Sequence, residues 1–192
     1  GGGIERLPSA VWQVRAEELV AVGRSDLATR LLERRAATVP DDFASRIQLG
    51  QLYLGAGRGA EAAQLVRNLI DAAQNRTVDA SIVGHAHLLL GLTLLHQRQL
   101  DAARAEFETA LRFDPTLHDA RVNLGVSDLL AGRLPEAERQ FRAVVAELPE
   151  HDSANYHLGL IWSAQGREAE AERAFERAVK ENPKHFDALQ QL

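Results

Sequence analysis

The sequence predicts an all-α protein, a solenoid of stacked antiparallel helix hairpins, and the main evidence is a repeat of 34 residues. Leu-Gly pairs end at Gly91, Gly125 and Gly159, which are spaced 34 positions apart. Prolines, alanines and phenylalanines keep the same interval over the same stretch. Aromatic residues make up only 5% of the chain, whereas Ala, Leu, Glu and Arg, all strong helix formers, are abundant. A fixed period of this length indicates stacked repeats.

Each unit is expected to hold two helices of different character. In residues 84–117, the segment 88–95 is apolar nearly all round, which is typical of a helix buried on most sides. The segment 100–113 instead places apolar residues three or four positions apart, with charged residues between them. That spacing predicts a helix with one buried face and one solvated face.

Small and special residues determine how the two helices meet and where they end. Gly91 and Ala103 are short enough for the helices to approach closely, and Phe107 is large enough to fill the joint between them. Pro115 cannot continue a helix and therefore ends the hairpin. In the turn of the next unit, Gly132 stands where a helix ends in the left-handed conformation.

The period also sets the boundaries of the units. Residues 1–8 are interpreted as a linker or a cloning remnant, and residues 9–192 as a single array. The units are 9–42, 43–76, 84–117, 118–151 and 152–185, followed by a partial first helix at 186–192. Seven residues at 77–83 interrupt the period, because Gly57 and Gly132 lie 75 positions apart instead of 68.

The insertion at 77–83 has two interpretations. It lengthens the first helix of the third unit, with Asp79 as a capping residue, or it forms a loop after a second helix that ends near Gln74. The apolar residues Ile82 and Val83 favour the longer helix. Either way, the stacking of the second and third units should be locally offset.

The repeat resembles the tetratricopeptide (TPR) family. The last full unit carries the residues that make the resemblance, at positions 8, 20, 24, 27 and 32 of the unit: Gly159, Ala171, Phe175, Ala178 and Pro183. The resemblance covers about five units and implies a right-handed superhelical α-solenoid of the TPR type. In that family the first helices line a concave groove, so positions 2, 5, 6, 9, 12 and 13 of each first helix are implied to face it.

These positions give the candidate binding residues, which are a mixture of amides, imidazoles and apolar side chains. The candidate peptide-binding residues are Gln48, Gln51, His85, Leu88, Leu92, Asn123, Val126, Tyr156, His157 and Leu160, with Gln13, Glu17 and Ile47 at further groove positions. Asn123 stands out because an amide can donate to and accept from a peptide backbone at once. Alternatively, Asn123 only bonds to a neighbouring helix, and the leucines only pack against neighbouring helices.

The groove is predicted to bind an apolar or amphipathic peptide or helix, as part of a non-catalytic protein–protein interaction scaffold. Some TPR proteins hold a C-terminal carboxylate with Lys and Asn side chains, but Leu88, Leu92 and Ser153 stand where this clamp would need them. Two other functions are open. The chain, which lacks a start methionine, could be a targeting or oligomerisation domain excised from a larger enzyme such as a bacterial transferase, or an envelope or secretion assembly factor. The groove could also mediate self-association.

No catalytic residue, metal site or cofactor is expected. The chain has no cysteine, and no two of its seven histidines have the i, i+4 spacing of a helical zinc site. No nucleophile-elbow motif accompanies the Ser, His and Asp residues. The net charge of -5 argues against a nucleic-acid partner, and no apolar run approaches the roughly 18 residues of a membrane-spanning helix. The sequence does not distinguish a cytoplasmic from a periplasmic location.

Overall fold

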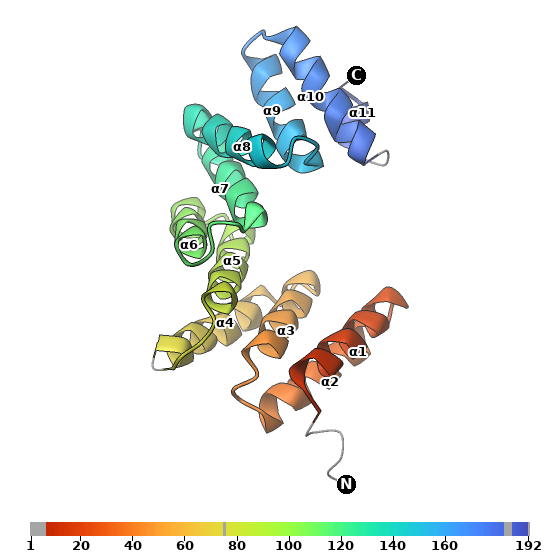
Figure 1. Ribbon diagram of the computed structural model, residues 1–192, viewed down its shortest axis with the longest axis vertical. Coiled ribbons are helices and arrows are strands. Elements are labelled where there is room, and N and C mark those ends of the chain that lie inside the picture. Colours follow the sequence, from red (N-terminus) through yellow and green to blue (C-terminus); the bar gives the residue numbers. More distant parts are fainter. Residues whose placement is uncertain (1–6, 75, 183–185, 192) are drawn as a thin grey trace.

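The computed structural model describes residues 7–74, 76–182 and 186–191, and within these ranges it consists of helices joined by short turns, without any strand. The first helices of successive hairpins are α1 (Ser9–Ala21), α3 (Phe43–Gly55), α5 (Ala80–His96), α7 (His118–Leu130) and α9 (Asp152–Ala164). The second helices are α2 (Ser25–Thr38), α4 (Gly59–Gln74), α6 (Leu100–Phe113), α8 (Leu134–Glu147) and α10 (Glu168–Glu181). The hairpins follow one another along the long axis of the molecule (Figure 1). The predicted all-α solenoid is confirmed.

A short helix, α11 (Phe186–Leu189), follows the fifth hairpin and begins where the period expects a sixth first helix. Ala188 of this helix is fully buried and belongs to the same core cluster as Phe175 of α10. Three predicted features lie outside the described residues: the first six residues of the linker at 1–8, Pro183, and Leu192 at the end of the partial helix.

Glycine and phenylalanine form the close contact inside each of the three C-terminal hairpins, as the sequence predicts. A Cβ atom added to Gly91, Gly125 or Gly159 would lie 2.5, 2.8 or 2.4 Å from the nearest ring carbon of Phe107, Phe141 or Phe175. Real Cβ atoms are essentially never found at such separations, and all three rings are buried. The two helices of each hairpin therefore approach as closely as they do because the facing residue has no side chain.

The turns between the paired helices share one backbone geometry. Gly23, Gly57, Gly132 and Gly166 all have φ between 74° and 76°, which is the left-handed conformation expected at a helix end. The third hairpin keeps the same geometry without glycine, because Arg98 has a φ of 61°. The repeat therefore imposes the turn even on a residue that prefers another conformation.

The insertion mainly lengthens the first helix of the third hairpin. α5 has 17 residues, whereas the other four first helices have 13. It begins at Ala80, and the side chain of Asp79 accepts a hydrogen bond of 2.8 Å from the backbone N–H of Ser81. The added residues Ile82 and Val83 are half-buried against the core. The prediction of a longer helix is confirmed, and α4 ends at Gln74 as the other interpretation expected.

A buried ion pair joins the first two hairpins. The Nε atom of Arg35 donates to Oδ2 of Asp42 at 2.6 Å, and the two side chains are only 7% and 3% exposed. Ser9 and Ser45 also donate to Asp42, which caps α3. Burial raises the pKa of Asp42, but the hydrogen bonds from Ser9, Arg35 and Ser45 outweigh it and hold the pKa below its ordinary value.

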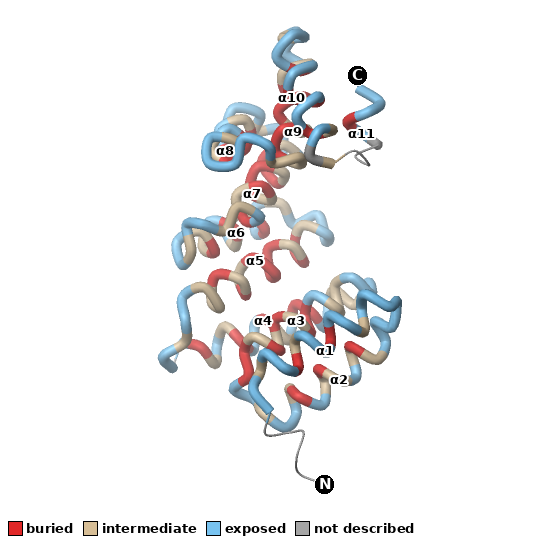
Figure 2. Tube along the Cα trace, turned by 45° about the vertical axis from the view of Figure 1, so that its right-hand side comes forward, coloured by how far each residue is buried: buried red, intermediate tan, exposed pale blue. Residues whose placement is uncertain are grey.

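The arginine that follows three of the turn glycines binds an acidic residue of the preceding unit. The pairs are Arg58 with Glu33 at 3.5 Å, Arg133 with Asp101 at 2.8 Å, and Arg167 with Glu138 at 3.3 Å. These side chains are partly exposed, or largely exposed in the case of Asp101, so each pair contributes about 1 kcal/mol or less. The core, in contrast to these surface pairs, consists of buried residues along the sides where the helices pack together, as Figure 2 shows for α5, α7 and α9.

Candidate functional site

The first helices of the first three hairpins enclose a hollow of about 310 Å³. Its lining comes from three helices that are far apart in the sequence: Gln13 and Glu17 of α1, Ala44, Ile47, Gln48 and Gln51 of α3, and Ser81, Ile82 and His85 of α5. Seven of these nine residues stand at groove positions of the repeat: the six named from the sequence, Gln13, Glu17, Ile47, Gln48, Gln51 and His85, and Ala44, which is position 2 of its unit. The period thus identified residues from three units that the fold brings to one place.

Two side-chain donors of the hollow are already hydrogen-bonded to backbone oxygen atoms. Nε2 of Gln48 donates to the backbone oxygen of Gln13 at 3.3 Å, which links α3 to α1. Nδ1 of His85 lies 2.8 Å from the backbone oxygen of Ser81. Because a carbonyl oxygen only accepts, Nδ1 carries a proton, and in the corresponding neutral tautomer Nε2 is the acceptor.

The apolar candidates are more deeply packed than the sequence suggested. Leu88 is only 8% exposed and lies in the core, so its side chain packs against neighbouring helices. Leu92, Val126 and Leu160 are partly buried, and each packs against one of the core clusters. For Leu88 the alternative of simple packing is therefore correct, and the other three offer only part of their surface to a ligand.

Asn123 bonds to its own helix. Its Nδ2 atom donates to the backbone oxygen of Asp119, one turn earlier in α7, at 2.8 Å. The alternative of a bond to a neighbouring helix is wrong for this donor. One of the two N–H donors of the amide is occupied, while Asn123 stays partly exposed on α7.

Tyr156 and His157 form an aromatic cluster with the core phenylalanines. The His157 ring stacks on Phe141 with a centroid distance of 4.9 Å, and Tyr156 is tilted against Phe175 at 6.0 Å. Burial, reinforced by the charge of Asp187, raises the pKa of the Tyr156 hydroxyl. Both side chains are half-buried, so packing accounts for much of their surface.

The comparisons with known proteins agree with this architecture. A family model described as tetratricopeptide repeat matches residues 14–77, 82–118 and 122–188. The chain belongs to the tetratricopeptide-repeat family. The interval between the first two matched segments falls in the insertion, where the period is broken.

Solved TPR structures share this fold along nearly the whole chain. A thermophilic TPR protein of Thermus thermophilus is 21% identical, with a TM-score of 0.71 and 96% coverage of both chains. MamA of Desulfovibrio magneticus is 18% identical, with a TM-score of 0.70 and coverage of 96% of this chain and 99% of its own. YrrB, described as a TPR protein with an unusual peptide-binding site, is 21% identical, with a TM-score of 0.64 and coverage of 95% and 91%.

Among curated proteins, the CTR9 homolog of Arabidopsis thaliana is 28% identical over 122 residues. That match takes in 64% of this chain but only 11% of the much longer relative. The similarity is therefore limited to one stretch of TPR units and says nothing about the activity of the whole relative.

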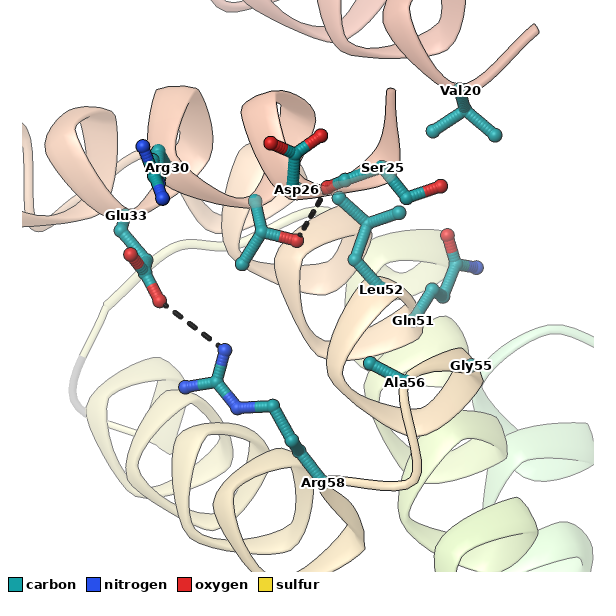
Figure 3. A pocket seen from close by; sticks show the side chains of 11 residues that line it. Val20, Ser25, Asp26, Arg30, Glu33, Gln51, Leu52, Gly55, Ala56 and Arg58 are labelled. Carbon is teal, nitrogen blue, oxygen red and sulfur yellow. Dashed lines mark hydrogen bonds and ion pairs between the residues drawn. The ribbon is translucent and has the colours of Figure 1, made fainter. Parts of the chain in front are cut away.

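A second, larger hollow of about 620 Å³ opens between the first two TPR units, beside the turns that follow α1 and α3. Figure 3 shows the ion pair between Glu33 and Arg58 across it, with Leu52 and Gln51 on the side of α3. Thr29 lines this hollow, and its hydroxyl turns back to donate to the carbonyl of Ser25 at 2.8 Å. Gln51 lines both hollows, so the two are neighbours.

The sequence contained a signal for this second hollow that the period alone did not reveal. Thr29 stands at position 21 of its unit, where the third and fourth units have the long side chains of Arg104 and Glu138. Those side chains reach the next unit, since Arg104 binds Asp128 at 3.3 Å and Glu138 accepts from Trp162 at 3.0 Å. Size at position 21 is not a sufficient signal, however, because the second unit has the still shorter Ala63 there and this residue is buried.

Over the described ranges, no three His, Cys, Asp or Glu side chains come together in a way that could hold a metal ion. In the same ranges, no helix is long and apolar enough to cross a membrane.

Proposed function

We propose that this TPR protein is a non-catalytic scaffold that binds an apolar or amphipathic peptide or helix along its first helices. The observation that supports this most strongly is the hollow shared by α1, α3 and α5, because its lining combines three glutamine amides with the aliphatic side chains of Ile47 and Ile82. TPR domains are in general protein–protein interaction modules, and YrrB is described as having a peptide-binding site.

The size of the hollow limits what it holds. At about 310 Å³ it is at the lower end of the roughly 300–1,000 Å³ typical of ligand pockets. It therefore accommodates one or two side chains of a peptide, and the rest of the segment lies along the surface of α7 and α9. There Asn123 offers polar contacts, and Val126 and Leu160 offer partly exposed apolar ones.

Gln51 is the best position for a test because it is exposed and borders both hollows. Peptides are first selected from a random display library on the wild-type protein. The affinity of a selected, fluorescently labelled peptide is then measured by anisotropy for wild type, Gln51→Arg and Gln64→Arg. Gln64 is the matched control, since it is an exposed glutamine on the second helix α4 and lines neither hollow.

Gln51→Arg should weaken binding roughly tenfold, which corresponds to about 1.4 kcal/mol, while the melting temperature stays that of the wild type. Gln64→Arg should bind like the wild type. Equal affinities of the two variants would show that the selected peptides bind elsewhere, and a failure to select any peptide would count against peptide binding altogether.

A further inference from the structure

The hollow between α1, α3 and α5 is rich in acceptors. Among its nine lining residues there is one carboxylate, Glu17, and no lysine or arginine. The full negative charge of the lining is therefore that of Glu17. Glu17 is exposed, so the charge lies at the open side of the hollow.

Two side-chain donors of the hollow are already bound, whereas one buried side-chain acceptor is left without a partner. Nε2 of Gln48 is directed to the carbonyl of Gln13, and Nδ1–H of His85 to the carbonyl of Ser81. By contrast, Oε1 of Gln48 is buried and has no hydrogen-bond partner among the described residues. A buried acceptor without a partner is costly to keep, so the site is better satisfied when a donor enters.

The bond that holds the Gln48 amide is weak enough to be exchanged. Its length of 3.3 Å is beyond the usual 2.7–3.2 Å for N–H···O bonds. Rotation of the side chain would exchange this long bond and turn Oε1 towards an incoming donor. Nε2 of His85 and the carboxylate of Glu17 supply two more acceptors around the same space.

We propose that this hollow takes a cationic hydrogen-bond donor, the guanidinium or ammonium group of a basic side chain in the bound peptide. The proposal rests on the proposed function, since the peptide delivers this side chain. Charge complementarity with Glu17 selects a cation, and the three acceptors match the several N–H groups of a guanidinium. Ala44, Ile47 and Ile82 give an aliphatic wall for the methylene stem.

A small probe tests the hollow directly. N-acetyl-arginine methylamide is titrated into ¹⁵N-labelled protein, and the side-chain NH₂ signals of Gln48 and Gln51 are followed by NMR. The analogous citrulline and norleucine methylamides serve as comparison probes, since citrulline keeps the shape of arginine without its charge. The arginine probe should give saturable shifts, citrulline weaker binding, and norleucine none.

Two variants of α1 then distinguish binding in the hollow from a general attraction of the cationic probe to the negatively charged protein. Glu17→Gln should weaken binding of the arginine probe roughly two- to fivefold, the range expected for an exposed ion pair. Glu18→Gln removes the same charge from an exposed residue that does not line the hollow and instead pairs with Arg15 at 2.7 Å. This control should leave binding unchanged.

Equal shifts with arginine and norleucine, or equal weakening by the two variants, would overturn the proposal. The outcome is independent of peptide selection. If selected peptides bind at Gln51 but the arginine probe causes no saturable shift, the assignment of a basic side chain fails and the proposed function stands. If the arginine probe binds as expected but no peptide is selected, the proposed function fails instead.

Discussion

Replacing Gly125 by alanine should destabilise the protein, because α7 and α8 meet there without room for a methyl group. The new Cβ atom would lie 2.8 Å from Cε1 and Cζ of Phe141. Since carbon atoms pack best at about 3.5–4.0 Å, the ring would have to move by roughly 1 Å. It cannot do so freely, because Phe141 is fully buried and stacks against His157.

The magnitude follows from two opposing effects. Overpacking a well-packed core costs about 1–3 kcal/mol, whereas alanine is favoured over glycine inside a helix by about 1 kcal/mol. Gly55→Ala is the matched control, because a Cβ atom at Gly55 would meet nothing within 4 Å. Gly125→Ala should therefore be less stable than Gly55→Ala by about 1–3 kcal/mol, which isolates the overpacking.

Urea denaturation followed by far-UV circular dichroism measures this difference. Phe141→Ala alone should cost about 3–5 kcal/mol through the cavity that it leaves. In that background the methyl group at position 125 has space, so Gly125→Ala should no longer destabilise the protein. The reasoning is refuted if Gly125→Ala is as stable as Gly55→Ala, or if its cost adds in full to that of Phe141→Ala.

Four further predictions concern the turns and the buried ion pair, and urea denaturation checks each, in a pH series for the last. Arg98→Gly should stabilise the protein by about 0.5–1 kcal/mol, because it removes left-handed strain at the cost of extra chain entropy. Gly132→Ala should lower stability by about 1 kcal/mol, because it introduces the same left-handed strain. If both variants stabilised the protein, or both destabilised it, the strain argument would be contradicted. Asp42→Ala should cost about 3–5 kcal/mol by removing one partner of a buried ion pair, whereas Asp41→Ala, which removes an exposed pair, should cost less than about 1 kcal/mol. The pKa of Asp42 is lower in the folded than in the unfolded state. Ionised Asp42 therefore adds to the free energy of unfolding above about pH 4, the unfolded pKa, and this stabilisation is lost as the pH falls through the folded pKa. In a pH series, Asp42→Asn should lack this loss of stability.

The sequence was sufficient for the features that depend on the period. A unit of 34 residues places glycine against phenylalanine and a left-handed residue at each turn, and the turn at Arg98 keeps this geometry although glycine is absent there. It also brought Gln13, Gln48 and His85 to one groove from three units. These are properties of position within the unit, which the repeat reproduces from one hairpin to the next.

Exposure could not be predicted in the same way, because it depends on what the neighbouring unit supplies. Leu88 occupies a groove position yet is buried in the core cluster that joins α3 to α7. The hollow beside Thr29 lies at a joint that Arg104 and Glu138 bridge in later units. The side chain of Asn123 turned to its own backbone, which spacing does not reveal.

The second unit lacks the phenylalanine that covers the helix-contact glycine in later units, and the lengthened α5 that follows the insertion supplies a substitute. Val66 stands at position 24 of that unit and is too short to cover Gly50 as the phenylalanines of later units cover their glycines. Leu89 of the lengthened α5 takes this role, because a Cβ atom at Gly50 would lie 2.6 Å from Leu89 Cδ2 but 3.4 Å from Val66 Cγ2. Restoring the consensus residue with Val66→Phe should therefore destabilise the protein by about 1–3 kcal/mol, since Val66 and Leu89 are 0% and 2% exposed. The same substitution should be tolerated better in a Leu89→Ala background. A Val66→Phe variant that is more stable than the wild type in urea would show that the missing phenylalanine and the insertion are unrelated.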